Sequence, residues 1–213
     1  MTTDRRVDMQ GRIGRWGSLF RPGAWGARPW LYAGWLLLLL AVVLDRPLTR
    51  TMSLHMLVHI PLILFSGLCF ARAWVLRDRD AWAWLSGFNG HGLAGLLFFN
   101  LVGAYWMIPK ALDEVLLSWP AALSKYVSVL IAGWVLYHSL RRANIVIQVF
   151  FIGNFCWMTA IVGLLYRDNP VRLCNFYLLD DQEIAGNGLV ALSILLPAIW
   201  FWVWRRRIWD FLR

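Results

Sequence analysis

Long apolar runs separated by short, arginine-rich polar segments dominate the pattern of this chain. A helix that crosses a membrane needs about 20 mostly apolar residues, within a range of roughly 17 to 25. Six runs meet this requirement, at residues 30–46, 51–71, 86–108, 121–139, 144–165 and 187–204. The pattern therefore predicts an all-α fold, a polytopic bundle of six transmembrane helices.

The same pattern divides the chain into a bundle at residues 30–204, a basic cytoplasmic N-terminal segment at 1–29 and a basic cytoplasmic tail at 205–213. The segment from Met1 to Arg28 holds six Arg and no apolar stretch of its own. A secretory signal peptide needs such a stretch and a small-residue cleavage site. We therefore expect the first span to remain in the mature protein.

Composition agrees with lipid as the natural solvent of this chain. Hydrophobic residues make up 60% of it and charged residues only 15%, against roughly 25% charge in soluble domains. The net charge of +9 comes from arginines clustered between the apolar runs. A nucleic-acid-binding surface would instead place them along one face, so no nucleic-acid partner is expected.

The 21 Lys and Arg residues indicate the orientation of the spans. With a cytoplasmic N-terminus, fifteen of them fall on the inner side and six on the outer side, namely Arg46, Arg50, Lys110, Lys125, Arg167 and Arg172. The acidic residues Asp113, Glu114, Asp168, Asp180, Asp181 and Glu183 also fall outside. The positive-inside rule thus predicts cytoplasmic N- and C-termini and a multi-pass location in a bacterial inner membrane.

The second run opens with the candidate chemistry of the chain, in residues Met52, His55, Met56 and His59. Their spacing of i, i+3, i+4 and i+7 places two thioethers and two imidazoles on one helix face. This combination suits Cu(I), a soft ion, and in the predicted orientation the site opens to the periplasm. The alternative is that the histidines bond to neighbouring helices while the methionines fill the core.

Other polar residues offer weaker candidates. Asp180, Asp181 and Glu183 precede the last run, where capping and the helix dipole explain acidic residues. A carboxylate there can also reach the histidine pair, as a metal ligand or as an acceptor that orients an imidazole. Met107 and Cys174 are further soft donors on the outer side.

The remaining histidines, His91 and His138, are expected at the inner side, away from the outer pair. Asn89 is expected to cap the start of the third span. Three amides inside the apolar runs are expected to be buried and to join helices by hydrogen bonds. These amides are Asn100, Gln148 and Asn154. No nucleophile with an adjacent base, phosphate-binding loop or HExxH motif is present, so we do not expect an enzyme.

Two segments resemble a known family. The run from His55 to His59, followed by Ile60-Pro61-Leu62 and Ser66-Gly67, resembles the HMxxH segment of the bacterial CtaG-type cytochrome c oxidase assembly proteins. Asp181-Gln182, with Gly186 four residues on, is similar to the DQxxxG segment of that family. The chain is shorter than typical members and has fewer predicted spans.

The resemblance implies a membrane factor that helps to mature a haem-copper oxidase by delivering copper. His55, Met56, His59 and Asp181 would then be functional residues, and Met52 joins them as a predicted ligand from the helix spacing. The expected partners are membrane lipid, a membrane metalloenzyme such as an oxidase subunit, and a periplasmic copper donor. The alternatives are a haem b-binding anchor of an electron-transfer complex, since intramembrane histidines can ligate haem, and a structural subunit.

Overall fold

The computed structural model describes residues 26–77, 87 and 89–212. Every regular element in these residues is a helix, which confirms the predicted all-α fold. The elements are α2 (Ala27–Val43), α3 (Asp45–Leu48), α4 (Met52–Leu54), a π-helical turn η2 (His55–His59), α5 (Ile60–Arg77), α6 (Leu93–Trp106), α7 (Pro109–Leu117), α8 (Trp119–Arg142), α9 (Ile145–Asp168) and α10 (Leu179–Leu212). Residues 1–25 of the predicted N-terminal segment lie outside the described part, and α10 continues into the predicted tail.

Four described helices are long and apolar enough to cross a membrane, so the chain is a multi-pass membrane protein. They are Met52–Arg77, which unites α4, η2 and α5, together with Trp119–Arg142, Ile145–Asp168 and Leu179–Arg205. A fifth span results if α6 and α7, which meet at a bend of 74°, are taken as one. The first predicted run corresponds to α2, which is apolar but only 17 residues long. Length and composition thus confirm four or five of the six predicted spans.

Small polar residues between the apolar runs set the helix boundaries. The Thr51 hydroxyl accepts a hydrogen bond from the Leu54 amide at 3.3 Å, where the second long helix begins. Ser118 caps α8, with a proline in its first turn, and the Asn144 side chain accepts from an amide at the start of α9. Side-chain acceptors at these positions satisfy amides that have no partner within the helix.

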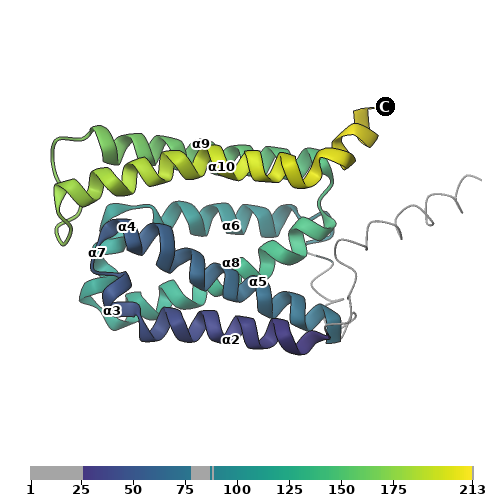
Figure 1. Cartoon of the computed structure of the whole chain (residues 1–213), viewed down its shortest axis with the longest axis horizontal. Helices are drawn as coiled ribbons and strands as arrows, with labels where there is room; N and C mark the ends of the chain where they lie inside the picture. Colours follow the sequence, from purple (N-terminus) through teal and green to yellow (C-terminus); the bar gives the residue numbers. More distant parts are fainter. Residues whose placement is uncertain (1–25, 78–86, 88, 213) are drawn as a thin grey trace, which may run out of the picture.

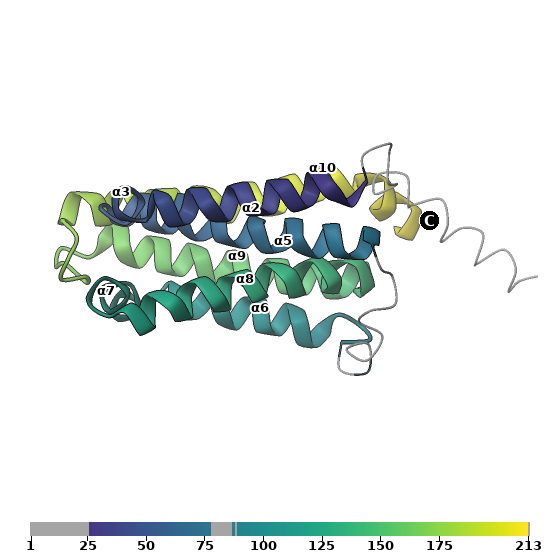
Figure 2. The ribbon, with the colours of Figure 1, turned by 90° about the horizontal axis from the view of Figure 1, so that it is seen from below.

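The helices run lengthwise through the bundle, with the α9–α10 hairpin along one side in Figure 1 and α2 along the opposite side. Helices α5, α6 and α8 lie between them in Figure 1. Figure 2, turned by 90°, shows α2 and α10 overlapping along one edge of the bundle and α6 along the other. The end that holds α3, α7 and the loop at residues 169–178 is called the α7 end below. The first described residues of α2 and the last of α10 lie at the other end of the bundle.

Reciprocal glycines bring two helix pairs into backbone contact. A Cβ on Gly67 of α5 or on Gly133 of α8 would strike a carbonyl oxygen of the facing helix. Gly163 of α9 and Gly186 of α10 show the same relation, because a Cβ on either would lie within 2.8 Å of the other's carbonyl oxygen. Small residues allow this close approach in membrane bundles, where van der Waals contact drives association.

Amide side chains join helices as the sequence predicts, although Asn154 is exposed, whereas Asn100 and Gln148 are buried as expected. The Asn154 side chain on α9 donates to the Asn100 side chain on α6 at 3.0 Å. Gln148 on α9 donates to the Leu140 carbonyl of α8 at 2.9 Å. Asn89 lies three residues before the αL glycine that precedes α6, and its side chain accepts from the Gly95 amide in the first turn at 3.1 Å.

Candidate functional site

The long second helix widens into a π-helical turn at His55–His59, where the Ile60 amide donates to the His55 carbonyl five residues earlier. Pro61 explains this local change, because it has no amide hydrogen to donate to the Leu57 carbonyl. The two imidazoles in this turn have ring centroids 5.5 Å apart. Both side chains are wholly buried, with 0% exposure, so any chemistry they perform depends on the groups packed against them.

Lys125, near the start of α8, lies between these two imidazoles. Its Nζ is 3.1 Å from His55 Nε2 and 3.2 Å from His59 Nδ1. The lysine side chain is also wholly buried, and Asp45 Oδ1 lies 3.7 Å from its Nζ. A buried amino group is costly unless it is hydrogen-bonded and its charge is paired. The two imidazoles and the carboxylate provide these partners.

The neighbours of His55 determine which ring nitrogen carries its proton. The Tyr177 hydroxyl donates to the Thr49 carbonyl at 3.2 Å, so its oxygen is left to accept from His55 Nδ1 at 2.8 Å. A neutral imidazole that donates through Nδ1 has its lone pair on Nε2. That lone pair faces Lys125.

In His59, too, one ring nitrogen donates and the other accepts from Lys125, but here Nε2 is the donor and Nδ1 the acceptor. Its Nε2 lies 3.0 Å from the Ala41 carbonyl, which can only accept, so Nε2 donates and Nδ1 presents its lone pair to Lys125. The Tyr126 hydroxyl lies 3.1 Å from the same Nε2 and donates to Asp45 at 2.8 Å. Every imidazole nitrogen of the pair therefore has a partner. We call this group the lysine cluster: Lys125, His55, His59, Asp45, Tyr126 and Tyr177.

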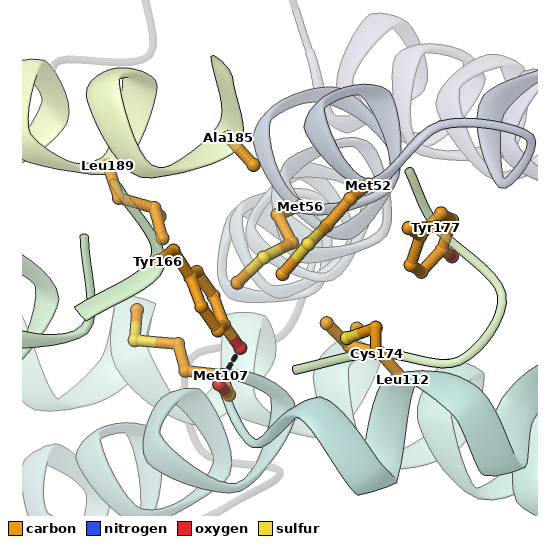
Figure 3. Close-up of a cluster of buried hydrophobic side chains, with 9 residues drawn as sticks. All are labelled: Met52, Met56, Met107, Leu112, Tyr166, Cys174, Tyr177, Ala185 and Leu189. Carbon is orange, nitrogen blue, oxygen red and sulfur yellow. Dashed lines mark hydrogen bonds between the residues drawn. The ribbon is translucent and has the colours of Figure 1, made fainter. Parts of the chain in front are cut away.

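Met52, in α4, and Met56, in the π-helical turn, belong to a separate buried group at the α7 end. Met52 and Met56 are 0% and 5% exposed, and they pack in one apolar cluster with Met107 and with Cys174 from the loop before α10. Figure 3 shows the Met52 and Met56 side chains extending side by side. The Met107 sulfur lies 4.0 Å from the Thr159 hydroxyl. We call Met52, Met56 and Cys174 the sulfur cluster, and Met107 packs in the same apolar group with its sulfur at Thr159.

Cys174 is held in the loop by contacts with α7. Its thiol donates to the Pro109 carbonyl at 3.7 Å. The next residue, Asn175, donates through its backbone amide to the Asp113 carboxylate at 2.8 Å. Burial, reinforced by the Asp113 carboxylate, raises the pKa of the Cys174 thiol to about 12. The thiol is therefore protonated at neutral pH, and a metal ion that binds it has to displace a proton.

Asp181 lies at the N-terminal end of the long second helix rather than against the imidazoles. Its carboxylate accepts from the Met52 amide and, at 2.6 Å, from the Ser53 hydroxyl. A carboxylate at this position satisfies free amides and the positive end of the helix dipole. Asp181 thereby ties α10 to the helix that carries both clusters.

The neighbouring Gln182 performs a similar connecting role. Its side chain, 1% exposed, accepts from the Leu173 amide of the loop at 2.8 Å and donates to the Tyr166 carbonyl of α9 at 3.1 Å. Gly186 is the glycine of the close α9–α10 contact described above. Each matched position of the DQxxxG segment thus has a packing or hydrogen-bonding role in this fold.

The structure divides the predicted ligand set. It brings His55 and His59 together, packs Met52 and Met56 elsewhere, and directs Asp181 to a helix start. Within the described residues, no group of three or more His, Cys, Asp or Glu side chains is placed to hold a metal ion. Metal binding by the predicted residues stays a prediction.

The two other histidines take no part in either cluster. His91 is exposed in the turn before α6, and His138, near the C-terminal end of α8, packs its ring against Trp134 with centroids 5.9 Å apart. Sequence reasoning missed Lys125 as a site residue and treated it as a topology signal. Its position inside the apolar run 121–139 was the available sign, because a charge within a span is costly and tends to mark a polar centre.

Comparison with protein-family models, with curated proteins and with solved structures finds no match for this chain.

Proposed function

We propose that the protein is a six-span, copper-handling protein of the bacterial inner membrane, which passes Cu(I) to a partner metalloenzyme or assists its assembly. The observation that carries this proposal is the pair of buried thioethers of Met52 and Met56, side by side in one cluster with the Cys174 thiol. Thioether and thiol sulfurs are the donors that select Cu(I). Ligand exchange between such donors transfers the ion without any bond-making catalysis.

The distribution of arginines supports cytoplasmic termini. Arg28, Arg77 and Arg142 lie at the ends of α2, α5 and α8 away from the α7 end, and Arg205 lies in the last part of α10. The positive-inside rule assigns that side to the cytoplasm. The α7 end then faces the periplasm, where a copper donor would meet the sulfur cluster.

The imidazole pair does not fit a metal ion in this arrangement, because both lone pairs accept hydrogen bonds from Lys125. The proposal therefore rests on the sulfur donors, and His55 and His59 act in it by holding Lys125. The same geometry leaves neither imidazole with a nitrogen for haem iron, so no observation favours the haem b alternative.

The test is a Cu(I) titration of the purified protein in detergent against a chromophoric competing chelator. Wild type is expected to bind Cu(I), and the Met52→Leu/Met56→Leu variant to bind it about tenfold or more weakly. Leucine replaces methionine at nearly constant volume, so the fold should persist. Met107→Leu is the matched control, because its sulfur faces Thr159, and its affinity should equal that of wild type. Equal affinities of wild type and the double variant would overturn the proposal.

A further inference from the structure

We infer that the His55–His59 pair is the binding shell of the chain's own Lys125 amino group, and that this amino group excludes metal ions from the pair. This inference concerns the lysine cluster and holds whether or not the sulfur cluster binds copper. It departs from the family resemblance, which implies a functional role for both histidines toward copper. It rests on three features of the geometry.

The first feature is that both imidazole lone pairs meet at one atom. Lys125 Nζ lies 3.1 Å from His55 Nε2 and 3.2 Å from His59 Nδ1. A zinc-like ion would need a position about 2.0 to 2.1 Å from each nitrogen, within the space that the amino group fills. The amino group and a metal ion cannot occupy that position together.

The second feature is that the far side of each ring is fixed. His55 donates to the Tyr177 hydroxyl at 2.8 Å, and His59 donates to the Ala41 carbonyl at 3.0 Å. Hydrogen bonds of this kind orient imidazoles that bind metals and set their tautomers. The pair is therefore organised like a metal-binding pair, with an amino group in the metal position.

The third feature is a carboxylate within reach of the same point. Asp45 Oδ1 lies 3.7 Å from Lys125 Nζ and 3.5 Å from His59 Nε2. Two imidazoles and one carboxylate, with water as a fourth ligand, make up a set that binds Zn²⁺ and related ions. Removal of the lysine amino group should thus convert the lysine cluster into a divalent-metal site.

The experiment uses Co²⁺ as the probe, because its visible absorption reports imidazole ligands. Lys125→Ala is expected to gain one bound Co²⁺ per chain, while wild type binds none through this pair. The matched control is Lys125→Ala combined with His55→Ala and His59→Ala, which should lose the gained ion. A folded Lys125→Ala protein that binds no Co²⁺ would overturn the inference.

A second measurement on wild type keeps the test decisive if Lys125→Ala fails to fold. Nitrogen NMR of histidine-labelled wild type should show the proton on Nδ1 for His55 and on Nε2 for His59. Addition of Zn²⁺ should leave both sets of resonances unchanged. Shifts of the imidazole nitrogens on Zn²⁺ addition would show that metal reaches the pair, and would refute the inference while leaving the sulfur-based proposal untouched.

Discussion

The lysine cluster and the sulfur cluster lie at neighbouring positions of one helix, yet they differ in how their atoms are held. In the lysine cluster each imidazole nitrogen and the lysine amino group have a directional partner, and the partners come from α2, α3, α8 and the loop before α10. In the sulfur cluster the thioethers of Met52 and Met56 pack among apolar side chains. Tyr177 borders both groups.

This difference shows that helical spacing alone did not decide the environment of the predicted ligands. A hydrogen-bond network whose groups are all paired has one low-energy arrangement, because each buried group left without a partner costs free energy. The methionine side chain is flexible and needs no hydrogen-bond partner, so it can pack in more than one arrangement. The polar group thus fixes the helices that it joins, whereas the methionine side chains keep the adaptability that the proposed exchange of a soft ion would require.

The largest expected effect comes from reversing the charge in the lysine cluster. Lys125→Glu places a carboxylate beside Asp45 and removes the donor to both imidazoles, which should cost about 3 to 5 kcal/mol. A thermal melt in detergent should show a melting temperature lower by roughly 10 °C. The control Lys110→Glu, on an exposed residue of α7, should melt close to wild type. Equal melting temperatures of Lys125→Glu and Lys110→Glu would contradict the claim that directional contacts of Lys125 hold the lysine cluster together.

An intermediate effect is expected where α10 is tied to the helix that carries both clusters. Asp181→Ala removes the acceptor of the Met52 amide and the Ser53 hydroxyl and should cost about 1 to 2 kcal/mol of unfolding free energy. Denaturant unfolding of Asp181→Ala and of the control Asp180→Ala measures the effect. Asp180→Ala, which changes an exposed neighbour, should stay within about 0.5 kcal/mol of wild type. Equal losses in both would contradict a capping role for Asp181.

The last prediction concerns the rate at which the Cys174 thiol reacts, and no change in stability is expected. Because its pKa is raised to about 12, the reactive thiolate stays scarce at pH 7 to 9 and grows only toward the raised pKa. In a Cys69→Ala/Cys156→Ala protein, maleimide should therefore label the folded chain slowly at pH 8, and rapidly once the chain is denatured. Labelling of the folded protein at the rate of a free thiol would show that the sulfur cluster is open to solvent.

Much of the fold followed from patterns that act along the chain. The apolar runs predicted where the helices lie, and the amides Asn100, Gln148 and Asn154 predicted links between helices that the structure contains. The sequence predicted six spans, whereas the described helices meet the length and composition of four or five, because α2 is short and α6 bends into α7. The sequence also singled out Asp181, but its contact with Ser53 lies 128 residues away along the chain.

The order of apolar runs, the basic segments and the His–Met spacing on one helix are properties of the sequence by itself, since each depends on residues near one another along the chain. Only the tertiary structure decided that Lys125 reaches the two imidazoles, 66 and 70 residues before it, and that Cys174 lies with the methionines. The physical reason is that a buried polar group takes whichever partner the packing brings within about 3 Å. Helix packing is set by close contacts such as Gly67 with α8, which no local pattern specifies.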